Sequence, residues 1–336
     1  MKQYKEASDI LDRIKKAKRI LLSTHVGPDP DSVGSNLAMY EILKKLGKDN
    51  VEVISPDRVP KNLAFLPNIK KIKNEDITKV DLSGFDLFIS LDAADPYRLT
   101  ENRSDFQTPA NLTVIVIDHH TTNSRYGAIN LVDEKIGSTG ELLYHLFRQW
   151  KVDIGESAAT SLLTGIVGDS VSFRHATTKD TLKAASDLME AGAPFGEISF
   201  NLYGRIPVEV LKFWGVVLSR LQIENVGTRS FVWVALPFSE ARGLSSGVGS
   251  STANMFLGNV EGVDFGVLMS EREEGKIGGN LRSRTDVDVA EITSLLGGGG
   301  HKAAAGFKYE LGGKSFEEGV SVILDTIKDY LRKNEK

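Results

Sequence analysis

The chain has 336 residues, with 41 Lys and Arg against 45 Asp and Glu, and it contains no cysteine. The lack of cysteine excludes disulfides, thiolate zinc sites, iron–sulfur clusters and cysteine nucleophiles. The net charge of −4 disfavours binding to long duplexes, which requires neutralising many phosphates, but it leaves short anionic substrates open. The length favours two or three domains, because single hydrophobic cores stop growing at roughly 250–300 residues.

The sequence predicts a cytoplasmic protein with no membrane association. The N-terminal segment is charged and amphipathic and lacks the apolar core of a secretory signal. The longest apolar run, Ser157–Gly168, is shorter than the ~20 residues that a membrane-spanning helix requires.

The first half of the chain alternates helical and strand patterns after an initial amphipathic helix that carries Ile10 and Ile14. Apolar runs predict strands at Arg19–His25, Val51–Ile54, Leu87–Leu91 and Leu112–Ile117. Helical spacing predicts helices at Ser32–Leu46, Thr139–Trp150, Glu156–Val167 and Thr178–Ala191. Strands separated by helices favour an α/β fold with a mostly parallel sheet flanked by helices.

The pattern restarts after a changeover that contains Pro194, Pro207 and the amphipathic stretch Val208–Leu221. Strands at Phe231–Leu236 and Phe265–Met269 and a last helix at Phe316–Leu331 predict a smaller C-terminal α/β domain. We therefore divide the chain into a catalytic domain (1–192), a partly helical connection (193–221) and a substrate-binding domain (222–336). We expect an active cleft between the two domains.

Side chains that can bind metal follow three of the predicted strands, and another follows a helix. They are His25, Asp92, the run Asp118-His119-His120, and Asp169. In open α/β sheets, ligands bind beyond the carboxyl ends of the strands, so we expect these side chains to converge.

The turn after the first strand adds Asp29 and Asp31, each preceded by a proline. Pro28 and Pro30 restrict the backbone, so we expect both carboxylates to project from a stiff turn rather than from one helical face. A helix that begins near Ser32 would place its positive end beside them.

The candidate metal ligands contain no sulfur. They are His25, Asp29, Asp31, Asp92, His119 and Asp169. Four carboxylates and two imidazoles favour Mn²⁺, with Mg²⁺ as the alternative, over structural zinc. Because clustered carboxylates repel one another, we expect two divalent cations about 4 Å apart that share one carboxylate, an arrangement suited to phosphoryl chemistry.

These motifs together resemble the DHH phosphoesterase family. They are His25-x-x-Pro-Asp29-x-Asp31-x-x-Gly34-Ser35, Leu91-Asp92-x-x-Asp95-x-x-Arg98, Asp118-His119-His120 and Thr164-Gly165-Ile166-x-x-Asp169. In the second domain, Leu281-Arg282-Ser283 and Gly298-Gly299-Gly300-His301 resemble the DHH-associated C-terminal domain. The short length resembles the nanoRNase and 3′-phosphoadenosine-5′-phosphate phosphatase (NrnA-type) branch.

The resemblance implies one ion on His25, Asp29 and Asp92, with Asp92 bridging to a second ion. That second ion would take Asp31, Asp92, His119 and Asp169. The implied catalytic residues are Asp92, Asp118, His119 and His120, where Asp118 orients an imidazole and His120 faces the scissile phosphate. The implied nucleophile is a hydroxide that bridges the metals.

The implied substrate contacts come from both domains. They are Arg98, His120, Arg282, Ser283, Gly298, Gly299, Gly300 and His301. The glycine run predicts a flexible loop whose N–H groups bind an anion, although an ordinary loop is the alternative. Arg98 binds phosphate or pairs with Asp95, and these two interpretations stay open.

The resemblance implies hydrolysis of short single-stranded oligoribonucleotides to nucleoside 5′-monophosphates and of 3′-phosphoadenosine 5′-phosphate to AMP. The alternatives are a cyclic-dinucleotide or pApA phosphodiesterase and, outside enzymes, a nucleotide-binding sensor. The sequence leaves open a homodimer, the cleavage polarity and the preference for RNA or DNA. Two departures from the family pattern, Pro30 between the aspartates and Ser170-Val171-Ser172 after Asp169, bear on the contour of the pocket.

Overall fold

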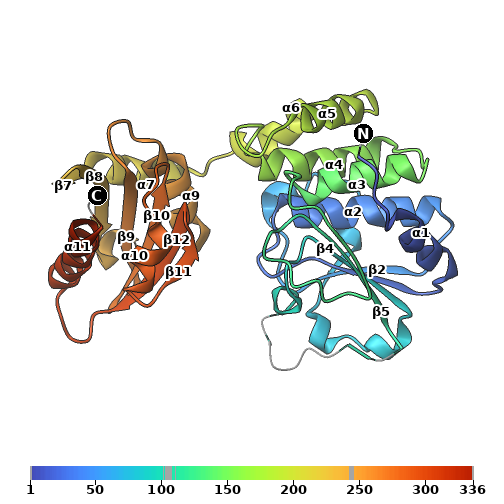
Figure 1. Ribbon diagram of the computed structural model, residues 1–336, viewed down its shortest axis with the longest axis horizontal. Helices are drawn as coiled ribbons and strands as arrows, with labels where there is room; N and C mark the ends of the chain where they lie inside the picture. Colours follow the sequence, from blue (N-terminus) through green and yellow to red (C-terminus); the bar gives the residue numbers. More distant parts are fainter. Residues whose placement is uncertain (1, 101, 103–107, 110, 242–245, 335–336) are drawn as a thin grey trace. The chain divides into compact units, whose positions relative to one another are not determined.

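The computed structural model describes residues 2–100, 102, 108–109, 111–241 and 246–334. The chain divides into two compact units, Met1–Arg205 and Ile206–Lys336, and each is a six-stranded sheet packed against helices (Figure 1). The expected α/β class is thereby confirmed. The boundary between the units lies inside the segment that we treated as a connection, and its helix α7 (Val208–Ser219) packs on the C-terminal sheet through Phe213 and Val217.

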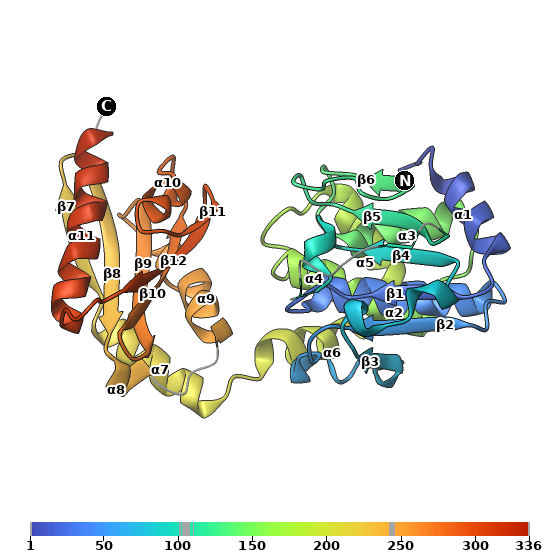
Figure 2. The ribbon, with the colours of Figure 1, turned by 90° about the horizontal axis from the view of Figure 1, so that it is seen from below.

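The sheet of the N-terminal unit is wholly parallel, with strand order β3-β2-β1-β4-β5-β6 (Figure 2). Its strands are β1 (Ile20–Ser23), β2 (Val51–Ser55), β3 (Ile72–Asn74), β4 (Leu87–Leu91), β5 (Thr113–Asp118) and β6 (Ile129–Val132). The strand order runs outward in opposite directions from the β1–β4 pair. In such sheets a crevice opens beyond the carboxyl ends of the two central strands, and ligands bind there.

Helices cover one face of this sheet, and short 3-10 turns cover the other (Figure 1). The helices are α1 (Ala7–Lys16), α2 (Pro30–Lys45), α3 (Thr139–Gln149), α4 (Glu156–Asp169), α5 (Lys179–Glu190) and α6 (Phe195–Ser199). On β1, Leu22 joins the core under the helices and its neighbour Leu21 joins the core under the 3-10 turns. Because both faces are buried, the central strands appear in the sequence as continuous apolar runs.

Helix α2 begins two residues earlier than we predicted. Asp29 has an extended backbone (φ −109°, ψ 179°), as expected between prolines, and its side chain caps the helix by accepting from the N–H groups of Asp31 and Ser32. The expectation that Asp31 also projects from the turn is wrong. Pro30 occupies the first helical position, where a missing N–H costs nothing, so Asp31 lies in the first turn of α2.

Glycines let α2 and α4 pack with their backbones almost touching. A Cβ atom at Gly34 would overlap the carbonyl oxygen of Ser161, and one at Gly165 would overlap the carboxylate of Asp31. The same close packing brings Gly168, near the end of α4, against the ring of Pro30. Small residues at this crossing therefore bring the first turn of α2 to the last turns of α4.

The sheet of the C-terminal unit has the order β11-β12-β10-β9-β8-β7, in which only the β8–β9 pair is parallel. Its strands are β7 (Gln222–Val226), β8 (Arg229–Leu236), β9 (Phe265–Glu273), β10 (Lys276–Ser283), β11 (Gly299–His301) and β12 (Ala304–Glu310). Helices α10 (Val289–Ser294) and α11 (Phe316–Lys333) cover one face, and α7, α8 (Phe238–Ala241) and α9 (Ser246–Met255) lie against the other. Within the described ranges, no helix has both the length and the apolar character needed to cross a membrane.

The glycine tract is not the flexible loop that we expected. Gly299–His301 forms β11 and pairs antiparallel with β12. A Cβ atom at Gly298 would overlap the carbonyl oxygen of Gly306, and one at Gly300 would lie 2.6 Å from that of Ala304. Close approach of this segment to β12 therefore gives Gly298 and Gly300 a structural reason, independent of any anion.

We predict that Gly34→Ala destabilises the protein, because its methyl group would meet the backbone of α4 rather than a flexible side chain. Overpacking of this kind typically costs roughly 1–3 kcal/mol of unfolding free energy. Chemical denaturation should show that loss. A matched control is Gly196→Ala in α6, where an added Cβ has no neighbour within 4 Å. An equal effect of the two substitutions would contradict the account of the α2–α4 crossing.

Candidate metal centre

All six predicted metal ligands converge at the carboxyl ends of β1, β4 and β5. Three groups of side chains each bring their ligand atoms within 4.8 Å of one another. The groups are His25 with Asp29 and Asp92; Asp31 with His119 and Asp169; and Asp92 with Asp118, His119 and His120. Asp92 and His119 each belong to two groups, so the three groups form one continuous cluster.

Asp92 lies at the centre of this cluster and turns one carboxylate oxygen to each side. Its Oδ2 lies 3.6 Å from His25 Nε2, and its Oδ1 lies 3.5 Å from His119 Nε2. The residue follows β4 in a left-handed conformation (φ 59°), and its N–H bonds the carbonyl oxygen of Ile117 on β5. A left-handed residue directly after a strand is uncommon, although aspartate tolerates it, and strain of this kind is found most often at functional sites.

Asp31 is fully buried and is held by the N-terminus of α3. Its two carboxylate oxygens accept the N–H groups of Thr139 (2.6 Å) and Gly140 (2.9 Å). These N–H groups belong to the first turn of a helix, where they have no partner within the helix and carry a positive partial charge. Burial, with the charges of Asp92 and Asp169, nevertheless raises the pKa of Asp31 well above its ordinary value.

His25 is held between two carboxylates and a carbonyl oxygen. Its Nε2 lies 3.3 Å from Asp29 Oδ2, and its Nδ1 lies 2.9 Å from the carbonyl oxygen of Val26. Burial by itself lowers the pKa of His25, but Asp29 and Asp92 outweigh it and raise the pKa to about 10. The Arg98 guanidinium lies 3.4 Å from His25 Nδ1, so the structure places this arginine at the edge of the cluster. The carboxylate of Asp95, the alternative partner that we considered for Arg98, accepts the N–H of Tyr97.

His119 provides a direct test of whether the residues suit a metal ion. Its Nε2 is buried and makes no hydrogen bond, although Asp169 Oδ2 lies 3.2 Å away. Burial lowers the pKa of His119, but the surrounding carboxylates of Asp169, Asp31 and Asp92 raise it to about 10. For Asp169, burial and the charges of Asp92 and Asp29 raise the pKa to about 6 despite His119. A buried ring nitrogen without a hydrogen bond that faces carboxylates fits a divalent cation.

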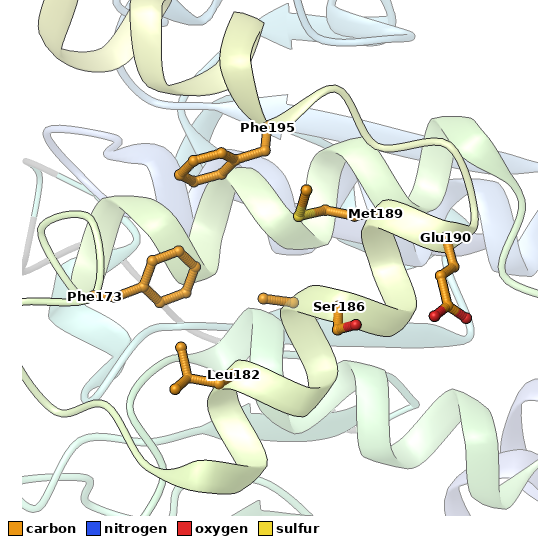
Figure 3. A pocket seen from close by; sticks show the side chains of 7 residues that line it. Phe173, Leu182, Ser186, Met189, Glu190 and Phe195 are labelled. Carbon is orange, nitrogen blue, oxygen red and sulfur yellow. The ribbon is translucent and has the colours of Figure 1, made fainter.

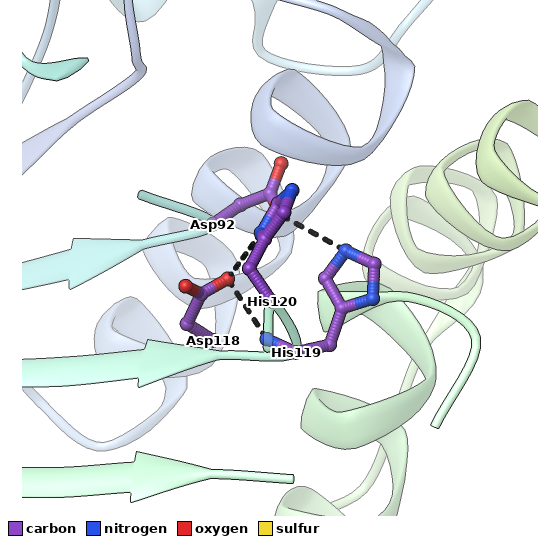
Figure 4. Close-up of side chains that lie close together, drawn as sticks. All are labelled: Asp92, Asp118, His119 and His120. Carbon is purple, nitrogen blue, oxygen red and sulfur yellow. Dashed lines mark hydrogen bonds and ion pairs between the residues drawn. The ribbon is translucent and has the colours of Figure 1, made fainter. Parts of the chain in front are cut away.

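The carboxylate of Asp118 has three hydrogen-bond partners within the cluster and beside it. Its carboxylate accepts from the N–H of His119 (2.8 Å), contacts Nδ1 of His120 (2.8 Å) and accepts from Asn123 (2.6 Å), as Figure 4 shows for the two histidines. Burial alone raises its pKa, but the bond with His120 and the other donors lower it below the ordinary range. The contact with Asp118 raises the pKa of His120. Asp118 thus holds the backbone of His119 and the imidazole of His120.

The chain makes a left-handed turn shortly after Asp169. Val171, Ser172 and Phe173 have φ of 49°, 55° and 64°. Left-handed conformations of such residues cost roughly 1–2 kcal/mol each, so the turn needs support from its surroundings. Ser170 provides part of it, because its hydroxyl bonds the carbonyl oxygen of Ile166 and accepts the N–H of Phe173.

The predicted substrate residues of the C-terminal unit lie on β10 and β11, except Gly298, which immediately precedes β11. Arg282, partly buried, donates to the carbonyl oxygen of Leu281 (2.7 Å) and to the side chain of Asn254. Burial, with the neighbouring Arg284, lowers its pKa. Ser283 is buried, whereas Gly299, Gly300 and His301 are exposed.

Sequence reasoning missed the contribution of α3. Thr139 donates its hydroxyl to Asp92 Oδ1 (3.0 Å) and its N–H to Asp31, so this one residue binds both buried carboxylates. The spacing of Ser138 and Glu141 marks the start of a helix, and the Ser138 side chain accepts the N–H of Glu141. This capping pattern predicts where the helix begins, but it does not predict that Asp31 and Asp92 lie beside the helix start.

Comparison with known proteins identifies the family. Residues 19–166 match the DHH family, N-terminal domain, and residues 234–333 match the DHHA1 domain. A protein of Thermus thermophilus, the bifunctional oligoribonuclease and PAP phosphatase NrnA, is 33% identical over 93% of this chain and 90% of its own length. The chain belongs to the DHH family. The Bacillus subtilis protein of the same name is 28% identical over 85% of this chain and 88% of its own length.

A solved structure shows the same fold over the whole chain. An exopolyphosphatase-related protein from Bacteroides fragilis superposes with a TM-score of 0.85, covers 98% of both chains and is 24% identical. The DHH match includes five of the six predicted ligands, and Asp169 lies just beyond its end. The whole run Asp118-His119-His120 lies with Asp92 in one of the three metal-capable groups, and His119 belongs to a second group as well.

We predict that metal binding by this DHH protein releases protons. His25 and His119, with pKa values of about 10, carry protons at pH 7 in the metal-free protein, and a metal ligand must be deprotonated. Affinity for Mn²⁺ should therefore rise as the pH rises from 6 towards 10. Calorimetric titrations in buffers of different ionisation enthalpy would count the protons, with His301→Gln in the C-terminal unit as a control that behaves like wild type. Binding that is independent of pH would refute the prediction.

Proposed function

We propose that the protein is a phosphoesterase that uses two divalent cations, preferably Mn²⁺, to hydrolyse short oligoribonucleotides and 3′-phosphoadenosine 5′-phosphate. The products would be nucleoside 5′-monophosphates and AMP, respectively. The names of the Thermus and Bacillus relatives, which match most of this chain and of their own length, support this choice.

The observation that carries the proposal is the position of Asp92. One of its oxygens faces His25 and the other faces His119, so a single buried carboxylate lies between two sets of ligands. Asp29 would complete the first set, and Asp31 with Asp169 the second. Two cations bound in this way would offset the repulsion of four carboxylates, stabilise the charge that develops on a phosphoryl group and activate water.

The remaining residues would position the substrate and its leaving group. His120 is held at Nδ1 by Asp118, and its side chain is 44% exposed, so its other nitrogen can donate to a phosphate. Because the hydrogen bond with Asp118 raises the pKa of His120, the imidazole holds its proton to a higher pH than an isolated one and can give it to the leaving oxygen. Arg98, beside His25, would bind a second phosphate oxygen.

The C-terminal unit would select for short substrates. We propose that Arg282, Ser283 and His301, with the backbone of Gly298, Gly299 and Gly300, bind a terminal phosphate. The partial burial of Arg282 supports this role, since a guanidinium with fewer water contacts gains more from a phosphate.

A second candidate activity is hydrolysis of cyclic dinucleotides or pApA. The cyclic-di-AMP phosphodiesterase PdeA of Listeria monocytogenes is 24% identical over 87% of this chain, but this chain matches only 45% of that protein. The full-length match to the Thermus protein favours the first candidate. The complete set of predicted ligands argues against a catalytically silent nucleotide sensor.

We expect Asp92→Ala to abolish Mn²⁺-dependent turnover while leaving the protein folded, because it removes a ligand of both proposed ions. The loss should exceed ~10³-fold, in line with removal of a central electrostatic group. Hydrolysis assays with circular dichroism would measure both effects. Asp95→Ala, which removes a nearby carboxylate outside the three groups, serves as the control and should retain most of the activity. Near-wild-type turnover by Asp92→Ala would overturn the assignment.

The substrate choice predicts a preference for short chains. Purified protein with Mn²⁺ should cleave RNAs of two to five nucleotides and 3′-phosphoadenosine 5′-phosphate faster than longer RNAs, cyclic di-AMP and pyrophosphate. Arg282→Ala should raise the KM for the short RNAs with little change in kcat, because it would remove binding and not chemistry. Faster cleavage of long RNA, or of cyclic di-AMP, would reject this choice in favour of another phosphoesterase activity.

A further inference from the structure

The C-terminal end of α4, which carries Asp169, is supported by a segment near the end of the N-terminal unit. This segment consists of α6 and the π-helical turn Phe200–Gly204 that follows it. The unit itself ends at Arg205, so the same segment leads into the C-terminal unit. A π-helical turn is rare and often marks a functional position.

Two aromatic side chains of this segment contact α4 and the left-handed turn. The Tyr203 hydroxyl donates to the carbonyl oxygens of Val167 (2.9 Å) and Gly168 (3.3 Å), which lie immediately before Asp169. The ring of Phe195 packs on that of Phe173, with centroids 5.9 Å apart (Figure 3). Segment 195–204 therefore contacts the chain on both sides of Asp169.

The hydroxyl of Tyr203 binds two carbonyl oxygens at the C-terminal end of α4. The last carbonyls of a helix have no partner within it, and terminal turns fray unless a side chain or the following chain binds them. Val167 accepts the N–H of Ser172 from the left-handed turn, and Val171 bonds Gly168 in the same way. Both acceptors of Tyr203 are thus the residues that also fix the turn. The phenol stays protonated and able to donate, because burial, with a contribution from Asp169, raises its pKa to about 12.

We propose that Tyr203 is a positioning residue that holds the end of α4, and with it the Asp169 carboxylate, in the orientation that binds metal. The hydroxyl would do so from the segment that leads into the C-terminal unit. A change of backbone direction near Arg205 would therefore alter the position of Asp169 through the side chain of Tyr203. The inference rests on the proposed metal site. Tyr203 touches neither metal nor substrate in this account and is not a catalytic residue.

The test is a titration of Tyr203→Phe with Mn²⁺ in the absence of substrate. The substitution keeps the ring and removes only the hydroxyl. We expect at least one Mn²⁺ to bind roughly two- to ten-fold more weakly, the range that the net contribution of one hydrogen bond gives. The rise in Tm on adding Mn²⁺ should be smaller than in wild type, since Asp169 would contribute less. A purely structural role would lower the Tm of the metal-free and metal-bound protein equally.

The matched control is Tyr330→Phe in the C-terminal unit, which removes a tyrosine hydroxyl bonded to Glu291 (2.7 Å). It should bind Mn²⁺ like wild type and show the same rise in Tm. Tyr203→Phe with the affinity and Tm rise of wild type would overturn the inference while leaving the proposed function in place. Failure of the wild type itself to bind Mn²⁺ would instead overturn the proposed function.

Discussion

Burial of carboxylates beside one another is the constraint on which the N-terminal unit depends. Asp31 and Asp92 are 0% and 2% exposed, and the charge of Asp92 raises the pKa of Asp31. Removing such a group from water costs several kcal/mol unless partners replace the water. The chain provides those partners from α3, through two N–H groups and the hydroxyl of Thr139, and from the imidazoles that follow β1 and β5. The remaining negative charge is what divalent cations would neutralise.

Close packing of helices and a strained backbone hold these carboxylates beside one another. Glycines at the α2–α4 crossing leave no room for side chains, which brings Asp31 against Gly165 and the last turn of α4 against Pro30. The backbone is left-handed at Asp92 and again in the turn after Asp169. Strain that persists in this way requires surroundings that hold it, and here strand pairing, the Ser170 hydroxyl and the Tyr203 hydroxyl do so.

The sequence alone predicted which metal-capable side chains follow the central strands and that they lie close together. Strands β1, β4 and β5 are buried on both faces and form continuous apolar runs, so their ends, and the residues after them, could be located. Their convergence follows because parallel strands end at the same edge. The short edge strand β3 and the glycine-containing β10 were not recognised, since neither has a clear apolar pattern.

Contacts that only the tertiary fold creates could not be predicted. Nothing local to Thr139 indicates that it binds Asp31 and Asp92, which lie 108 and 47 residues away along the chain. The run of glycines before His301 predicted a flexible loop. Close approach to another strand also requires glycine, so the residue type alone does not distinguish the two. Likewise, Ser170-Val171-Ser172 gives no warning of a left-handed turn, because a β-branched residue rarely adopts one.

The central claim is that Asp92 bridges two cations, and diffraction recorded at the manganese absorption edge from crystals grown with Mn²⁺ tests it most directly. The account predicts two anomalous peaks roughly 4 Å apart with the Asp92 carboxylate between them. His25 and Asp29 should lie on one side, and Asp31, His119 and Asp169 on the other. A single peak, or two peaks that do not share Asp92, would contradict it.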